Sequence, residues 1–174
     1  MKVSQKAVVC FFLLCLGLLG LGPKVEAGIL TVSPVAFRPV DSVSDNERTW
    51  YAHETELYVL HSVDGPYFVA PVYLPNGAIV RKVTVYLTDN GTGPDDEVRV
   101  YLRRQNLMTG VVQTMTYVCN HSPALPHKPS RQTMTDTTIS YRTINNGSYS
   151  YTVYVWFIFD CTDRVRFHGV KIEY

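Results

Sequence analysis

The residues with the clearest capacity for chemistry are acidic and amide side chains grouped in one short segment. They are Asp89, Asn90, Asp95, Asp96 and Glu97. Ca²⁺ binds carboxylate and amide oxygens of this kind, although the spacing of an EF-hand loop is absent. The same residue types also form polar hairpin turns. The segment therefore supports two interpretations, a structural calcium site with Asp89, Asp95, Asp96 and Glu97 as ligands, and a solvated turn.

Motifs that would identify an enzyme are absent. The sequence has no nucleophile elbow, zinc-binding H-E-x-x-H, phosphate-binding glycine loop or dinucleotide fingerprint. The nearest arrangement to paired catalytic carboxylates is Glu54 and Glu56, which share a strand face with Tyr58. Most glutamates at such positions face water. The first hypothesis is therefore a non-enzymatic module for binding or extracellular structure, and the alternative is a carbohydrate hydrolase with dispersed carboxylates.

Tyrosine and arginine side chains share one side of two predicted strands. Residues 79–88 and 98–104 alternate apolar and polar side chains, as half-buried strands do. We expect these strands to pair across residues 89–97, with their valines in the core. Their outward side chains would form a tyrosine–arginine strip, composed of Tyr86, Arg99, Tyr101 and Arg103. Such a strip would bind a glycan or a protein surface, or would instead stabilise the sheet by cross-strand pairing.

The apolar pattern from residue 28 onward has a period of two, and it predicts an all-β domain. Val, Ile, Tyr, Thr and Phe fill the pattern, and glycine, proline and asparagine turns separate the segments. We predict a two-sheet antiparallel β-sandwich, jelly-roll-like, with about eight or nine strands. The predicted strands are residues 29–35, 56–62, 67–73, 79–88, 98–104, 111–118, 138–143, 149–159 and 164–174.

Three segments give more specific expectations. Both faces of residues 149–159 are apolar or aromatic, so this run is either a central strand or one side of a homo-oligomer contact. The alternation slips at Gly169, which predicts a β-bulge. Residues 120–132 contain three prolines and are predicted to be a loop, and a short strand is expected near Trp50.

The cysteines and the N-terminus both indicate export. Lys2 and Lys6 precede an apolar run, and small residues at Ala27 and Gly28 follow it, so residues 1–27 are predicted to be a cleaved signal peptide. The single domain would then comprise residues 28–174, without a membrane span, in a secreted or periplasmic location. Only Cys119 and Cys161 would remain, and we expect them to form one disulfide.

The charge of the processed chain argues against a nucleic-acid partner. Removing Lys2, Lys6, Lys24 and Glu26 changes the 16 basic and 15 acidic residues to 13 and 14. Binding to nucleic acid would require a clustered excess of basic residues. The partners that remain are a glycan, a protein surface or a second copy of the chain.

Several short motifs resemble those of uncharacterised secreted bacterial β-sandwich modules. The matching motifs are Leu74-Pro75-Asn76-Gly77-Ala78, Val83-Thr84-Val85-Tyr86, Thr88-Asp89-Asn90, Val98-Arg99-Val100-Tyr101-Leu102-Arg103, Tyr149-Ser150-Tyr151 and the segment from Phe167 to Tyr174. The resemblance covers about residues 65–174. It implies a jelly-roll-like fold and no particular activity.

Overall fold

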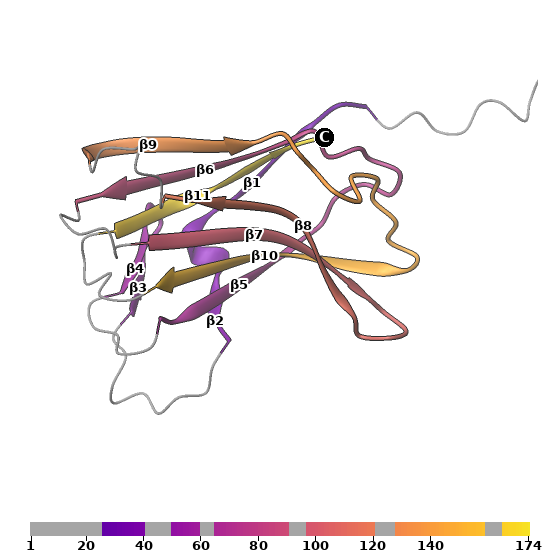
Figure 1. Cartoon of the computed structure of the whole chain (residues 1–174), viewed down its shortest axis with the longest axis horizontal. Coiled ribbons are helices and arrows are strands. Elements are labelled where there is room, and N and C mark those ends of the chain that lie inside the picture. Colours follow the sequence, from indigo (N-terminus) through magenta and orange to yellow (C-terminus); the bar gives the residue numbers. More distant parts are fainter. Residues whose placement is uncertain (1–25, 41–49, 60–64, 91–96, 121–127, 159–164) are drawn as a thin grey trace, which may run out of the picture.

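The computed structural model describes residues 26–40, 50–59, 65–90, 97–120, 128–158 and 165–174. These residues form two antiparallel sheets that lie face to face (Figure 1). This arrangement confirms the predicted two-sheet β-sandwich. Among the described residues, no helix is long and apolar enough to cross a membrane. The predicted signal peptide, residues 1–27, lies almost wholly outside the described residues and stays a prediction.

The first sheet has six strands. Its order is β3-β4-β11-β6-β9, and β1 also pairs with β11. The strands are β1 (Ile29–Val32), β3 (Trp50–Ala52), β4 (Leu57–Val59), β6 (Lys82–Asp89), β9 (Lys128–Asp136) and β11 (Val165–Glu173). The strand expected near Trp50 is therefore confirmed as β3.

The second sheet has five strands in the order β2-β5-β10-β7-β8. They are β2 (Arg38–Pro39), β5 (Tyr67–Val72), β7 (Glu97–Asn106), β8 (Val112–Cys119) and β10 (Tyr149–Ile158), and a short 3-10 helix, η1 (Pro34–Ala36), precedes β2. Because β10 lies between β5 and β7, the run from residue 149 is a central strand, which was one of the two expectations for it.

The core lies between the sheets and is built from alternate residues of each strand. Val83, Val85, Val98 and Val100 are all buried, as the period of two predicts. Edge-to-face aromatic contacts join distant segments, with Phe37 at 5.1 Å from Phe167 between ring centroids. Because alternate residues of each strand point into the core, the residues between them lie on the outer face of their sheet.

Gly169 marks the β-bulge that the sequence predicted in β11. The register of β11 against β6 shifts between Phe167 and Gly169, and Gly169 has a φ of 127°. Before the bulge β11 pairs with β4, and after it β11 pairs with β1. A Cβ on this residue would lie 2.8 Å from the carbonyl oxygen of Val32. Only glycine fits this junction without displacing β1.

Two strand predictions are wrong. Residues 120–132 were expected to be a loop, yet β9 begins at Lys128 and includes Pro129. Among the described strands, β9 pairs with β6 alone and so forms an edge of the sheet. The register of this pair shifts between Arg131, which lies opposite Thr88, and Lys128, which lies opposite Asp89. Proline is tolerated at such an edge irregularity, because no ladder hydrogen bond from its nitrogen is required there. Residues 138–143 do not form a strand, although Thr143 makes an isolated bridge with Ile79.

Candidate binding surface on the five-stranded sheet

Aromatic side chains extend across the outer face of the five-stranded sheet. Residues that alternate with the core positions of β5, β10, β7 and β8 point away from the other sheet. Four tyrosines and one tryptophan occupy these outward positions, and we name them the aromatic row: Tyr67, Tyr154, Trp156, Tyr101 and Tyr117.

Strand register brings the members of the aromatic row into contact. Tyr154 of β10 lies directly opposite Tyr101 of β7, and Tyr101 lies opposite Tyr117 of β8. The ring centroids of these two pairs are 6.0 and 5.0 Å apart. Tyr67 of β5 lies 5.3 Å from Tyr154 and 5.1 Å from Trp156. Four adjacent strands at a spacing of about 4.8 Å carry the row over roughly 15 Å.

The row is accessible at its surface. Tyr67, Tyr101, Tyr154 and Trp156 are half-buried, and Tyr117 is 41% exposed. Gly65 lies against one edge of Trp156, where a Cβ would be 2.6 Å from the indole nitrogen. Rings held by their neighbours lose little further freedom when a flat ligand covers them. The row is therefore a preformed platform.

Arg99 is held beside the row by an internal ion pair. Its Nε and one terminal nitrogen donate to the two carboxylate oxygens of Glu97 at 2.7 and 3.0 Å. Glu97 is buried, and its hydrogen bond raises the pKa of Arg99 above its usual range. The guanidinium carbon lies 5.1 Å from the ring centroid of Trp156. Arg99 is thus neutralised within the protein and packed on an aromatic ring.

Arg103 lies at the centre of the row. Its guanidinium carbon is 4.0 Å from the ring centroid of Tyr154 and 4.5 Å from that of Tyr101. These distances fall within the range of cation–π contacts. The outer surface therefore alternates aromatic rings with guanidinium groups.

A hollow of about 460 Å³ adjoins Tyr117 at the end of the row, where β8 faces β9. It is lined by Tyr117, Val118, Cys119 and residues 133–136. The hydroxyl of Thr116 donates to the carboxylate of Asp136 and so ties β8 to β9. Burial, followed by a hydrogen bond with Cys119, raises the pKa of Tyr117 well above its usual range. The Tyr117 phenol therefore stays protonated at neutral pH.

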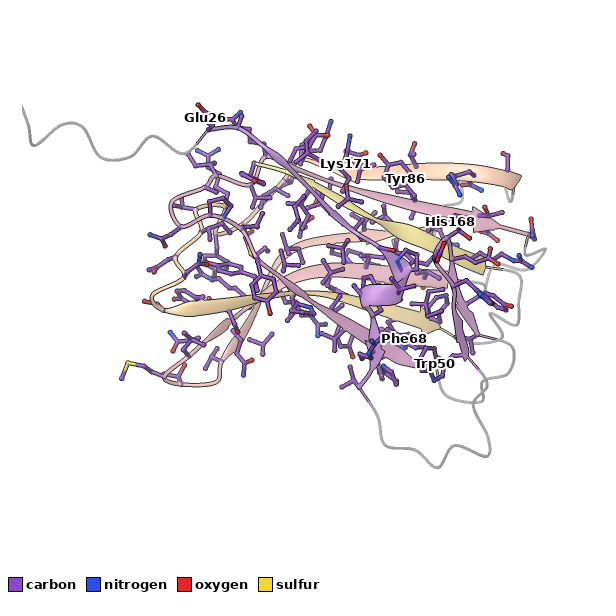
Figure 2. The ribbon with its side chains drawn as sticks, turned by 180° about the vertical axis from the view of Figure 1, so that it is seen from behind. Glu26, Trp50, Phe68, Tyr86, His168 and Lys171 are labelled. Atoms are coloured by element: carbon purple, nitrogen blue, oxygen red, sulfur yellow. The ribbon has the colours of Figure 1, made fainter. Side chains whose placement is uncertain are left out.

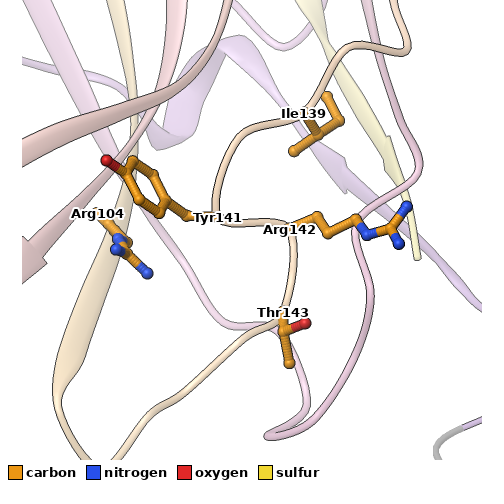
Figure 3. A pocket seen from close by; sticks show the side chains of 5 residues that line it. All are labelled: Arg104, Ile139, Tyr141, Arg142 and Thr143. Carbon is orange, nitrogen blue, oxygen red and sulfur yellow. The ribbon is translucent and has the colours of Figure 1, made fainter.

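A second hollow of about 460 Å³ lies at the end of the sandwich that carries residues 137–148 (Figure 3). Arg104, Ile139, Tyr141, Arg142 and Thr143 line it. The guanidinium carbon of Arg104 lies 3.8 and 4.1 Å from the ring centroids of Tyr141 and Tyr149. The contact with Tyr141 fastens the segment after β9 to the end of β7, and the contact with Tyr149 joins β7 to β10.

The predicted tyrosine–arginine strip is wrong in its pairing. β6 pairs with β11 and β9, whereas β7 pairs with β10 and β8. Tyr86 therefore lies on the six-stranded sheet beside Lys171, as Figure 2 shows, while Arg99, Tyr101 and Arg103 lie on the other sheet. The period of two correctly placed each side chain outside the core. The error was to pair consecutive strands, because the chain crosses to the other sheet between β6 and β7.

The predicted calcium ligands divide into described and undescribed residues. Asp95 and Asp96 lie outside the described residues. Asp89 is buried, and its carboxylate accepts a hydrogen bond from the side-chain nitrogen of Asn120 at 3.0 Å. Asn120 in turn accepts from the backbone nitrogen of Val98 at 2.6 Å. The described part of the segment thus links β6 to β7, and the calcium site stays a prediction.

The predicted disulfide also stays a prediction. Cys119 is half-buried at the end of β8. Cys161 lies outside the described residues.

The alternative catalytic pair is not favoured by the geometry. Both carboxylate oxygens of Glu56 accept hydrogen bonds from Arg166, at 3.1 and 3.2 Å, and the guanidinium of Arg166 lies over Tyr58. Glu54 is exposed. Glu56 therefore has a structural partner on β11.

Sequence reasoning missed four members of the row as parts of a common surface, namely Tyr67, Tyr117, Tyr154 and Trp156. The available signal was the two-sided aromatic pattern of β10, which requires cover for Tyr154 and Trp156. Alternation alone does not reveal that β10 lies between β5 and β7. That knowledge requires the sheet order, which places residues from four separate segments side by side.

Comparisons with known proteins agree with the fold. The sequence matches no protein-family model, and no curated protein matches it. Among solved structures, a xylan-binding module, CBM15, superposes with a TM-score of 0.51 at 13% identity over 85% of this chain and 97% of the module. The CBM22-1 and GH10 modules of Clostridium thermocellum endo-1,4-beta-D-xylanase 10B, complexed with xylohexaose, superpose with a TM-score of 0.54 at 11% identity, over 86% of this chain and 28% of that one. This chain therefore has the β-sandwich fold of these structures.

Proposed function

We propose that this protein is a carbohydrate-binding module whose aromatic row stacks against the sugar rings of a glycan chain. The observation that carries the proposal is the contact series from Tyr67 to Tyr117 across four strands. Aromatic rings offer flat apolar area that complements the faces of sugars, and the phenol hydroxyls add hydrogen bonds at the margins. A row about 15 Å long fits an extended oligosaccharide rather than one sugar.

The chemistry of the surface supports binding rather than hydrolysis. Glycoside hydrolysis requires two carboxyl groups on opposite sides of the scissile bond. The five strands of this sheet contain one acidic residue, Glu97, and Arg99 already engages both of its oxygens. The described surface thus offers rings and cations to a ligand.

The two neighbours with matching folds supply a starting ligand for tests. One is a xylan-binding module and the other was crystallised with xylohexaose. Xylan is therefore the first polysaccharide to test, beside β-glucan, galactomannan and acidic polysaccharides. Affinity gel electrophoresis identifies the binders, and calorimetry with oligosaccharides then gives dissociation constants.

The decisive variant is the double change Tyr101→Ala and Tyr154→Ala. Loss of two stacking rings should weaken binding at least about tenfold, because central aromatic contacts are each worth more than ~1 kcal/mol. Tyr86→Ala is the matched control, since Tyr86 is also a half-buried outer tyrosine but on the other sheet. It should bind as the wild type does.

A second variant guards against a folding defect in the double change. Tyr117→Ala alters the most exposed ring of the row and should fold while weakening the same ligand. If no polysaccharide binds the wild-type protein, or if Tyr86→Ala weakens binding as much as the row variants do, the proposal is wrong.

A further inference from the structure

Arg103 differs from Arg99, the other arginine that packs on the row, in having no partner of opposite charge among the described residues. The ion pairs of the described residues involve the cations Lys82, Arg99, Arg166 and Lys171, and Arg103 is in none of them. Its Nε is buried and makes no hydrogen bond. A buried donor without an acceptor is destabilising. The position is therefore incomplete within the described protein.

Arg99 shows what a complete position on the same strand face contains. Arg99 and Arg103 both project from β7 and both pack on aromatic rings. Two nitrogens of Arg99 donate hydrogen bonds to the carboxylate of Glu97. The nearest strand neighbours of Arg103 are Thr152 and Thr114, which carry no charge. The chain supplies a carboxylate to one of these arginines and leaves the other without one.

The charge of the whole sheet agrees with this contrast. Its strands contain four arginines, Arg38, Arg99, Arg103 and Arg104, and the single acidic residue Glu97. Arg38 donates to the backbone carbonyls of Val35 and Phe37. Arg104 donates to the side-chain oxygen of Gln113 in a hydrogen bond of 2.8 Å that lies away from the row. An uncompensated positive charge therefore remains at the centre of the row, on Arg103.

We propose that the glycan bound by the row is acidic, and that Arg103 binds the carboxylate of a uronate residue. This inference rests on the proposed carbohydrate-binding function. A guanidinium binds a carboxylate through two parallel hydrogen bonds, and such charge-assisted bonds are strong. The Nε of Arg103 is buried, so the two terminal nitrogens would donate these bonds. Stacking on Tyr154 and Tyr101 fixes the orientation of the guanidinium before ligand arrives.

The position of Arg103 also affects a neutral ligand. Its guanidinium packs against the Tyr154 and Tyr101 rings, so a sugar stacked at the centre of the row also contacts the cation. A neutral sugar gains only neutral hydrogen bonds there, whereas a uronate gains an ion pair in a partly desolvated site. The surface therefore discriminates in favour of the charged sugar.

The test compares acidic polysaccharides with their uncharged methyl esters and with neutral polysaccharides. Wild-type protein is titrated with polygalacturonate, glucuronoxylan and alginate, with their methyl-esterified forms, and with neutral xylan, β-glucan and galactomannan. We expect at least one acidic polysaccharide to bind about tenfold more tightly than its methyl ester and every neutral polymer. That preference should shrink as salt rises, because ions screen the pair.

Variants assign the preference to Arg103. Arg103→Gln should abolish the tenfold preference, and Arg103→Lys should retain only part of it, since lysine lacks the planar fork. Arg81→Gln removes the same charge at an exposed position outside the strands and should change nothing.

The possible failures are distinguishable. Binding of neutral polymers as tightly as acidic ones would overturn the acidic ligand and leave the carbohydrate-binding function standing. A preference for sulfated over carboxylated polymers would overturn the uronate assignment. Absence of binding to every polymer would overturn both. If Arg103→Gln does not fold, the methyl-ester and salt comparisons on the wild type still test the charge of the ligand, and Arg103→Lys, which keeps the charge, still tests the residue.

Discussion

The outer faces of the two sheets follow the same alternation but carry different chemistry. On the six-stranded sheet several polar side chains pair with one another, although the Nε of Arg166 is buried without a hydrogen bond. Thr84 bonds Thr135 at 3.3 Å, and Glu173 bonds both Lys82 and Lys171 at 2.8 and 2.9 Å. On the five-stranded sheet the outward positions hold the aromatic row and an unpaired arginine. Paired surface groups stabilise the fold, whereas an accessible aromatic row with an arginine that lacks a carboxylate partner is suited to bind a ligand.

This comparison predicts that changes in the six-stranded sheet act on stability and changes in the row act on binding. The largest expected effect is that of Gly169→Ala. The new Cβ would collide with the Val32 carbonyl at a φ of 127°, so the free energy of unfolding should fall by about 2 to 3 kcal/mol. Urea denaturation measures the change.

Gly147→Ala is the matched control for Gly169→Ala. Its Cβ would lie no closer than 3.4 Å to a neighbour, and it should change the free energy of unfolding by less than about 0.5 kcal/mol. Equal stability of the wild type and Gly169→Ala would show that β1 does not dock at the bulge.

A smaller effect separates Arg99 from Arg103 on β7. Glu97→Gln removes the carboxylate that neutralises Arg99, and it should lower the free energy of unfolding by about 1 to 3 kcal/mol. Arg103→Gln should lower it by less than about 0.5 kcal/mol, because no ion pair is lost. Thermal melts of the two variants provide the comparison. Equal destabilisation would mean that Arg103 is as fully partnered as Arg99.

The smallest effect concerns Glu173 on the six-stranded face. Hydrogen bonds from Lys82 and then Lys171 lower the pKa of Glu173 from its ordinary value of 4.5. A lowered carboxyl pKa stabilises the fold above the unfolded-state value, and this contribution is lost as pH falls through the folded-state value. Glu173→Gln should therefore lower the melting temperature slightly at pH 7. The difference from wild type should vanish as the pH falls below 4.5, and a difference that persists in acid would contradict the assignment.

Sequence alone was sufficient for what depends on one strand at a time. Alternation placed Val83 and Val98 in the core and Tyr86 and Tyr101 outside it, and the phase slip located the bulge at Gly169. These features are local, because they follow from the two-residue repeat and from the backbone freedom of glycine.

Sequence was insufficient for what depends on how strands are ordered. Consecutive strands are neighbours in only about two-thirds of cases, and β6 and β7 belong to the remainder. The row needs Tyr67, Tyr101, Tyr117 and Tyr154 from four strands, and no local signal links them. The strand that contains Pro129 was missed for a related reason. Proline is tolerated in an edge strand, and the sequence does not show that β9 lies at an edge.

The central claim is that a glycan covers the row on the five-stranded sheet, and the two tryptophans allow a direct test in the wild-type protein. The chain has two tryptophans, Trp156 in the row and Trp50 in β3 of the other sheet, where it packs 5.5 Å from Phe68. Their indole N–H groups give separate signals in ¹H–¹⁵N NMR spectra. On titration with the oligosaccharide that binds best, we predict that the Trp156 indole signal and the backbone amides of β7 and β10 shift, while the Trp50 indole and the amides around Tyr86 do not. Shifts centred on Tyr86 and Lys171 with Trp156 unchanged would contradict it.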